Sequence, residues 1–437
     1  MTAGLRAFRE LRVGTALWST RAYLWSQAKL GDPAAQLLTR GTTPPYALYD
    51  RIREQGPLVT SRLGPRISAS HRIVSHLLRD HRLGVVQPGR RARGVLEPPE
   101  PLPEWIAHPI VDSLLSLDPP AHTRLRRLVS PWFTPRAINQ RSEQIRAIVD
   151  HFLDELDTSR PVDLVREFAV RVPIRVISDL LGVPDPDYPQ FARWGWILGT
   201  ALDGARTLKE LNAVRTTLVQ LDRFFRDLIE RRRHEPGDDV ISGLVHNAGG
   251  EEPVTSRELL ATAQLLLLAG FETTVNMIGS GVLALLDHPT QRDLLVAEPE
   301  RAANAAEEVL RYASPVQFTV RVVHREVEVE GIRLHPGEQV LLLLGGANRD
   351  PQVFPDPAQF DITRENAREH LAFSAGAHYC LGAGLARLEG TVALGALFRR
   401  FPRLELAGTP RYRSSRLIHG IQHLPVLLEG RRARVAS

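Results

Sequence analysis

The segment 371–384 constrains this chain more than any other stretch, because it holds the only cysteine among 437 residues. Gly376, Gly382 and Gly384 lie close to that cysteine, Cys380. Apolar residues at helical spacing follow, so we expect the sulfur to lie where a glycine-rich loop becomes a helix. The first N–H groups of a helix favour negative charge, which predicts an acidic thiol whose thiolate can bind a metal.

Three interpretations of Cys380 compete. A lone cysteine is most often a small buried hydrophobic residue. A cysteine with a histidine partner is a candidate nucleophile. The third interpretation rests on the pattern Phe373-x-x-Gly376-x-His378-x-Cys380-x-Gly382, whose glycines let a flat macrocycle approach the backbone. This pattern is moderately specific and gains weight only from motifs elsewhere in the chain.

The composition indicates a soluble globular chain large enough to enclose a cofactor. Hydrophobic residues make up 43% of the chain and charged residues 24%, both ordinary values. One cysteine excludes a disulfide within the chain, which fits a cytoplasmic protein. The net charge is +5 and no basic block alternates with aromatic residues, so we do not expect nucleic-acid binding.

Residues 1–44 are expected to form a helical N-terminal extension, followed by one domain over residues 45–437. We expect no signal peptide and no transmembrane segment in the extension, because it has no long apolar run. Residues 5–30 mix four arginines with tryptophan, tyrosine and leucine, so peripheral contact with a membrane surface is one interpretation. A helix packed on the domain is the more common explanation of such a segment.

The segment 255–288 predicts a long buried helix. Thr255 and Glu258 match a capping box, and apolar residues then continue on every face as far as Leu268. The following residues 269–274, Ala-Gly-Phe-Glu-Thr-Thr, weaken a helix, and a buried glutamate is costly without partners. Such a conflict inside a buried helix indicates either a functional site or a hydrogen-bonded kink.

Two further pairs of residues stand at helical spacing. His122 and Arg126 are four positions apart and would share a helix face that suits a carboxylate or a phosphate. Glu308 and Arg311 are three positions apart and can form an ion pair. Taken alone, each pair is more often a solvated surface feature. Two short strands are predicted over 58–67, a buried strand over 339–344 and further short strands over 405–430.

Taken together and in this order, the motifs resemble those of the cytochrome P-450 superfamily, from about residue 45 to the end of the chain. The resemblance implies a mainly α fold with a small β region that encloses haem b. It further implies a soluble bacterial haem-thiolate monooxygenase, which inserts one oxygen atom of O2 into an apolar small molecule, typically as a hydroxyl group. The electrons of such an enzyme come ultimately from NAD(P)H through a ferredoxin and a ferredoxin reductase.

The resemblance also assigns roles to single residues. Cys380 is implied to be the axial ligand of the haem iron. Glu272 and Thr273 are implied to be the catalytic acid and alcohol that manage protons during oxygen activation, and Glu308 and Arg311 to support the haem-binding core. The other residues implied to contact haem are His122, Arg126, Ala269, Gly270, Arg321, Phe373, Gly376, His378 and Gly382. The residues implied to line the substrate pocket are Trp194, Leu266, Ala269, Val316, Phe318 and Ile418.

Three positions depart from the family pattern. Ser374, Gln359 and Gly384 stand where glycine, arginine and proline are common, and none of these changes removes a ligand or a catalytic group. The proline-rich stretch 85–110 is expected to be a binding loop. For the redox partner we expect a docking face that includes Arg387 and the arginines of residues 124–127.

Two alternative functions stay open. The first is a peroxide-driven enzyme of the same fold, and the intact pair of Glu272 and Thr273 argues against it. The second is a non-catalytic module of this fold that recruits partner proteins, and the complete loop around Cys380 argues against that. The apolar pocket suggests a lipid, a terpenoid or a polyketide as substrate and does not choose between them.

Overall fold

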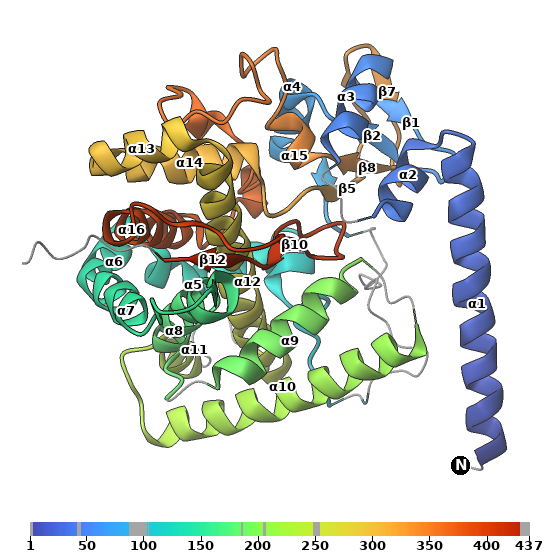
Figure 1. The fold of residues 1–437 in the computed structure, drawn as a ribbon. Helices are drawn as coiled ribbons and strands as arrows, with labels where there is room; N and C mark the ends of the chain where they lie inside the picture. Colours follow the sequence, from blue (N-terminus) through green and yellow to red (C-terminus); the bar gives the residue numbers. More distant parts are fainter. Residues whose placement is uncertain are drawn as a thin grey trace, which may run out of the picture.

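The protein is mainly helical, and its short strands form four small sheets within the described part of the chain. The computed structural model describes residues 3–41, 45–86, 103, 105–184, 187–203, 207–247 and 254–428. The predicted class, mainly α with a small β region, is confirmed. Figure 1 shows the other helices arranged around the long helix α12 (Ser256–Asp287), with the largest sheet set to one side.

Helix α12 begins at the predicted capping box. The Thr255 hydroxyl accepts a hydrogen bond from the N–H of Glu258, and the Glu258 carboxylate accepts one from the N–H of Thr255. Within the described residues, α12 is the one helix long and apolar enough to cross a membrane. Its most apolar window is 83% buried, which is the behaviour of a core helix. The helix continues through residues 269–274, where the hydroxyls of Thr273 and Thr274 donate to the carbonyl oxygens of Ala269 and Gly270.

Three helices pack along α12 at short range. They are α8 (Arg171–Leu181), α9 (Tyr188–Ala201) and α16 (Ala383–Arg400). Small residues permit this approach: a Cβ atom on Gly195 would lie 2.2 Å from the Phe271 ring, and one on Gly270 would lie 2.7 Å from Ile177. The stretch that weakens α12 as an isolated helix therefore also lets its neighbours come close.

The remaining helices surround this centre, and α10 runs across one end of the molecule (Figure 1). Their bounds are α2 (Pro33–Thr39), α3 (Tyr46–Gln55), α4 (His71–Arg79), α5 (Ala121–Val129), α6 (Pro135–Gln140), α7 (Ser142–Asp154), α10 (Leu208–His234), α11 (Val240–Asn247), α13 (Pro289–Ala297), α14 (Ala302–Tyr312) and α15 (Leu344–Ala347). Helix α1 (Ala3–Lys29) stands along the outside (Figure 1). None of the α1 residues whose side chains are described is buried.

The largest sheet has the strand order β1-β2-β8-β5-β3. Its strands are β1 (Val59–Thr60), β2 (Arg66–Ser68), β8 (Gln339–Leu342), β5 (Thr319–Val323) and β3 (Leu83–Gly84). Only the β2–β8 pair is parallel among these neighbours. The strand predicted over 339–344 is too long, because the chain turns into α15 at Leu344.

The smaller sheets confirm the strand patterns near the end of the chain. They are built from β6 (Val327–Val329) with β7 (Ile332–Leu334), from β10 (Arg411–Tyr412) with β11 (Ile421–His423), and from β4 (Val162–Asp163), β12 (Pro425–Leu427) and β9 (Glu405–Leu406). The main hydrophobic core surrounds α12, and two smaller clusters lie against the five-stranded sheet. The C-terminal hairpin β10–β11 reaches back from this region toward α12.

Candidate functional site

The loop around Cys380 is held by its backbone. The N–H of Cys380 donates to the carbonyl oxygen of Phe373 at 2.9 Å, and α16 begins three residues after the cysteine. Gly376 has a φ of +69°, and a Cβ atom there would lie 2.3 Å from the carbonyl oxygen of Leu78. Ser374 also has a positive φ of 60°, a conformation that glycine adopts without strain. The departure at Ser374 therefore falls on a strained position.

The thiol of Cys380 differs from the sequence prediction. Although Cys380 is exposed, protein atoms crowd its sulfur, and this desolvation raises the pKa of the thiol above its ordinary value. The N–H of Gly382 and the guanidinium groups of Arg126 and Arg387 act in the opposite direction without outweighing burial. The predicted acidification by the helix start is therefore wrong for the free thiol. A bound cation is what would favour its thiolate.

Basic side chains gather beside this loop from three separate elements. The rings of His122 on α5 and His378 in the loop lie 4.3 Å apart, centre to centre. Arg126, one turn after His122, donates to the carbonyl oxygen of Tyr379 at 2.7 Å. Arg321 on β5 is only 5% exposed and comes within 3.5 Å of the Ser374 hydroxyl. The structure thus brings together four of the predicted haem contacts.

These groups are short of negative partners. Within the described residues, neither Arg126 nor Arg321 forms an ion pair with a carboxylate, and the buried His122 Nε2 has no hydrogen-bond partner. Burial lowers the pKa of Arg321 to about 10 and that of His122 to about 4, and His378 and Arg126 act in the same direction on His122. Buried donors without acceptors are costly. The two propionate groups of a haem would supply the missing carboxylates, so these residues fit that cofactor.

Asp118 stands at the edge of the basic cluster and was missed from the sequence. Its carboxylate accepts hydrogen bonds from the N–H groups of Val85 and Val86. It also lies 3.8 Å from Nε2 of His378 and 3.7 Å from Nε2 of His324. The Asp-Pro-Pro sequence that introduces the cluster thus also carries a carboxylate that orients one of its histidines.

The middle of α12 holds the predicted acid and alcohol. The hydroxyl of Thr273 donates to the carbonyl oxygen of Ala269 at 3.3 Å. Glu272 is 5% exposed and forms an ion pair with Arg413, which sequence reasoning missed. Burial raises the pKa of Glu272 above its ordinary value, although Arg413 opposes the shift. The costly buried glutamate therefore has a partner, and this partner comes from the far end of the chain.

Glu308 and Arg311 form a fully buried ion pair with two contacts of 2.7 Å. The interpretation of this pair as a surface feature is wrong. Arg311 also donates to carbonyl oxygens of Asn348 and Gln359 at 3.0 Å. Arg364 approaches the Glu308 carboxylate at 3.4 Å, so a second arginine joins the pair even though residue 359 is glutamine. Every charge of the pair is compensated within the fold, which ties α14 to the segment before the cysteine loop.

The predicted pocket residues do not all meet. Val316 and Ile418 are joined by an isolated antiparallel bridge, and Leu266 lies in the buried first half of α12. Phe318 instead packs against a core cluster formed with α2 and α3. Trp194 stacks on Phe191 in an aromatic cluster of α9 and α10. Most of the expected binding loop, residues 87–102 and 104, lies outside the described residues.

Two of the arginines expected to face a redox partner are already engaged. Arg387 donates to Glu307 at 2.8 Å and to the Tyr379 hydroxyl at 2.9 Å, and its guanidinium lies 4.6 Å from the Phe373 ring centre. Arg124 forms an ion pair with Glu258. Arg387 therefore supports the cysteine loop rather than presenting an uncompensated charge. The sequence around Arg387 did not indicate Glu307 as a partner, because the two residues are 80 positions apart.

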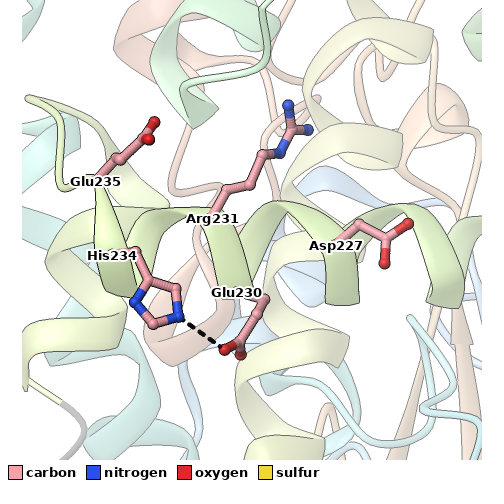
Figure 2. Close-up of a pocket in the computed structure, with 5 residues that line it drawn as sticks. All are labelled: Asp227, Glu230, Arg231, His234 and Glu235. Carbon is pink, nitrogen blue, oxygen red and sulfur yellow. Dashed lines mark hydrogen bonds and ion pairs between the residues drawn. The ribbon is translucent and has the colours of Figure 1, made fainter.

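A surface depression lies elsewhere, on the last turns of α10. Figure 2 shows its lining residues, and the Nε2 atom of His234 pairs with Glu230 at 3.2 Å. A second depression contains Trp132 and Arg141. Neither contains a residue predicted for the site. The residues predicted for the site lie instead on α5, on α12 and in the cysteine loop.

Comparison with known proteins identifies the family of the chain. The family model described as Cytochrome P-450 matches residues 100–414. The putative cytochrome P-450 140 of Mycobacterium tuberculosis is 40% identical over 425 residues, which cover 94% of each chain. The 6-deoxyerythronolide B hydroxylase of Saccharopolyspora erythraea is 40% identical over 395 residues, which cover 88% of this chain and 96% of that enzyme.

Solved structures show the same relationship. The structure of P-450BioI in complex with hexadec-9Z-enoic acid ligated acyl carrier protein is 36% identical, with a TM-score of 0.80, and the match covers 88% of this chain and 98% of that one. Sequence and fold thus agree over most of the chain. The chain belongs to the cytochrome P-450 family and is a bacterial monooxygenase of the P-450 type, with a haem iron and an O2-dependent reaction.

Proposed function

We propose that this protein hydroxylates an apolar small molecule and receives its electrons from a ferredoxin and a ferredoxin reductase. The observation that supports this proposal most directly is that His122, Arg126 and Arg321 have no carboxylate partner within the described residues, although His122 and Arg321 are buried. Haem iron with a thiolate ligand supplies the oxygen chemistry when it is bound. The chain supplies binding, orientation and proton handling.

In this proposal Cys380 binds the iron, while His122, Arg126 and Arg321 bind the two carboxylates of the haem. Charge-assisted hydrogen bonds of this kind hold a carboxylate firmly. Gly376 keeps the loop backbone close to α4, where a side chain would collide with Leu78. The cysteine loop is therefore fixed before any ligand arrives, which orients the sulfur.

Glu272 and Thr273 handle protons in this proposal. The Glu272 carboxylate takes up one proton and passes it on, and the Thr273 hydroxyl can donate a hydrogen bond when it leaves the carbonyl oxygen of Ala269. Apolar residues of α12 before this turn exclude water from the reacting region. The intact pair favours an enzyme driven by electrons and O2 over one driven by peroxide.

The substrate in this proposal is apolar, such as a lipid, a terpenoid or a polyketide. Val316, Ile418 and Leu266 offer only hydrocarbon surface, which favours such a molecule. The relative named 6-deoxyerythronolide B hydroxylase supports a natural product of this kind. The single thiol and the absence of a disulfide place the enzyme, in this proposal, in a reducing cytoplasm.

For the electron partner we retain the face around residues 124–127 and withdraw Arg387 as a main contact. Arg127 is exposed on α5, one residue after the haem-binding candidate Arg126. Arg127→Glu should lower ferredoxin-supported turnover and weaken its dependence on salt, because charged partners are steered by complementary charge. Unchanged turnover and salt dependence would place the docking face elsewhere.

The experiment that tests the proposed function is the absorption spectrum of the dithionite-reduced protein under carbon monoxide, recorded for the native chain and for Cys380→Ser. A strongly red-shifted Soret band that the substitution removes is the expected result. A band typical of histidine-ligated haem, or no haem at all, would overturn the proposal and favour a recruiting module. Turnover with peroxide alone, compared with turnover with ferredoxin and O2, separates the two catalytic alternatives.

A further inference from the structure

A buried ion pair connects the middle of α12 with the C-terminal hairpin. The Nη1 group of Arg413 contacts the Glu272 carboxylate, and both residues are less than a tenth exposed. Arg413 follows β10 directly, and its N–H donates to the carbonyl oxygen of Gly420 at 3.1 Å. Its Nε and Nη2 groups have no hydrogen-bond partner within the described part of the chain. Glu272 is therefore the main anchor of this guanidinium.

Helix α9 closes another side of the same carboxylate. A Cβ atom on Gly199 would lie 2.4 Å from Oε2 of Glu272, so the carboxylate fills the space that a side chain would need. The Trp196 ring centre lies 6.0 Å from the Arg413 guanidinium. Three elements, α9, α12 and the hairpin, thus meet around one carboxylate and restrict its orientation.

The hairpin is also hydrogen-bonded to the residues that follow α9. The Asp203 carboxylate accepts hydrogen bonds from the N–H groups of Arg416 and Leu417 at 2.6 and 2.7 Å. The next residue, Ile418, bridges to Val316 on the predicted wall of the substrate pocket. The segment that carries Arg413 is therefore continuous with a segment expected to touch substrate.

The charges around Glu272 are few. On α12, Asn276 donates to the backbone oxygen of Glu272 and is neutral. On α9, Trp196 and Gly199 carry no charge. Within the described residues, Arg413 is the one charged group that acts on the Glu272 carboxylate, and it opposes the rise in pKa that burial causes. Among the described residues, Arg413 is therefore the charged group that stabilises the carboxylate form of Glu272.

We propose that Arg413 is a positioning residue for proton handling, because its ion pair stabilises the carboxylate form of Glu272 and fixes the orientation of that side chain. The inference rests on the proposed function, in which Glu272 accepts a proton and passes it on. Glu272 returns to the carboxylate form after each transfer, and its pairing with Arg413 is restored. Proton supply to the oxygen site thus depends on the C-terminal hairpin as well as on α12.

Infrared spectroscopy tests whether Arg413 stabilises the carboxylate form of Glu272. The band of a protonated buried carboxyl group is assigned to Glu272 by its loss in Glu272→Gln. In Arg413→Gln this band should appear at a pH at least about one unit higher than in the native chain, a tenfold change in proton affinity. In Arg413→Lys, which keeps the positive charge, the band should appear at nearly the same pH as in the native chain. Arg411→Gln, a change at an exposed position of the same hairpin, should leave the band unmoved.

Turnover measurements test whether Arg413 supports the delivery of protons to the oxygen site. In Arg413→Gln, electron-driven hydroxylation should fall about tenfold or more, in the range of a lost acid–base contribution, and more of the reduced oxygen should leave as hydrogen peroxide. The acid limb of the pH–rate profile should move to higher pH. Peroxide-driven turnover should stay close to native. In the Glu272→Gln background, adding Arg413→Gln should have no further effect on these quantities, because the two residues act as one unit.

The outcomes that would overturn the inference are distinct from those that would overturn the proposed function. An unmoved infrared band in Arg413→Gln contradicts the electrostatic role. Equal losses of electron-driven and peroxide-driven turnover in a variant with native melting temperature contradict the proton role. Since the infrared measurement follows a carboxyl group and needs no turnover, it stays decisive even if the carbon monoxide spectrum excludes thiolate-ligated haem.

Discussion

Single residues in this structure carry strain and charge that their neighbours compensate. Ser374 holds a backbone conformation suited to glycine, two positions before Gly376, where glycine is required. Glu272 is a buried acid whose charged partner among the described residues, Arg413, lies far away in the sequence. The local sequence shows that a buried glutamate and a serine in place of glycine are unfavourable. The three-dimensional fold is needed to show which groups compensate them.

The strain at Ser374 leads to a prediction. Ser374→Gly should raise the free energy of unfolding by about 0.5–1 kcal/mol, because relief of a left-handed conformation outweighs the greater freedom of glycine in the unfolded chain. Ser374→Ala should give no such gain. Chemical denaturation of the three proteins measures the difference, and equal stabilities would show that the position is not strained.

At the scale of elements, the structure is held by polar contacts between segments distant in sequence. Arg311 on α14 reaches carbonyl oxygens of the segment before the cysteine loop, and Arg387 on α16 reaches Glu307 on α14. These contacts fix the loop that carries Cys380 from two sides. Arg311 is fully buried and Glu307 nearly so, which makes these contacts costlier to break than those of an exposed pair.

The pair on α14 gives the second prediction. Arg311→Met should lower the free energy of unfolding by about 3–5 kcal/mol, because Glu308 would keep a buried charge without its main partner. The exposed pair Arg301–Glu298 has the same spacing, and Arg301→Met should cost about 0–1 kcal/mol. Urea unfolding measures both. A similar small cost for the two substitutions would mean that Arg364 replaces Arg311 fully.

Some elements could be predicted well from the sequence, because all the residues that define them lie within one short segment. The capping box, the apolar run and the break in pattern at Glu272 all belong to one helix, and the loop around Cys380 is one short segment. Arg413 and Asp203 were missed because they lie in segments without periodicity, and only folding brings them to α12 and the hairpin. Arg387 was assigned to a docking face because its partner is eighty positions away.

At the scale of the whole molecule, the core belongs to the part of the chain after α1. Asp32 is the first buried residue among those described, and its carboxylate accepts bonds from the N–H of Ala35 and from the Ser61 hydroxyl. By contrast, Trp18 and Trp25 on α1 are exposed. Among the described residues, the buried part of the fold therefore begins near this aspartate, inside the segment 1–44 that was expected to be an N-terminal extension.

The third prediction follows from this boundary. Removal of residues 1–30 should change the free energy of unfolding by less than about 1 kcal/mol, because no described side chain of α1 is buried. Asp32→Ala in the full chain should cost about 1–2 kcal/mol, because it removes a helix cap and its buried contacts. Thermal or chemical unfolding compares the two, and a large loss on truncation would make α1 part of the fold.

The dependence of stability on pH is the fourth prediction. Burial lowers the pKa of His108 and of His419 from 6.5 to about 4. The unfolded chain therefore binds more protons than the folded chain between these values, and stability should fall as the pH drops from 6.5 toward 4. Substituting both histidines by glutamine should flatten this part of the curve. An equally steep loss in the double variant would assign it to other groups.

The solitary cysteine has a practical consequence for anyone who handles this enzyme. Because Cys380 is the only thiol in the chain, a thiol-reactive dye has a single target, and an iron atom bound to that sulfur would block it. Burial raises the pKa of this thiol, so labelling at a pH high enough to ionise it counts the molecules that lack cofactor, without any assay of turnover. Two cysteines added at the surface, one on the hairpin and one on α9, could then be labelled selectively in the loaded enzyme and used for distance measurements.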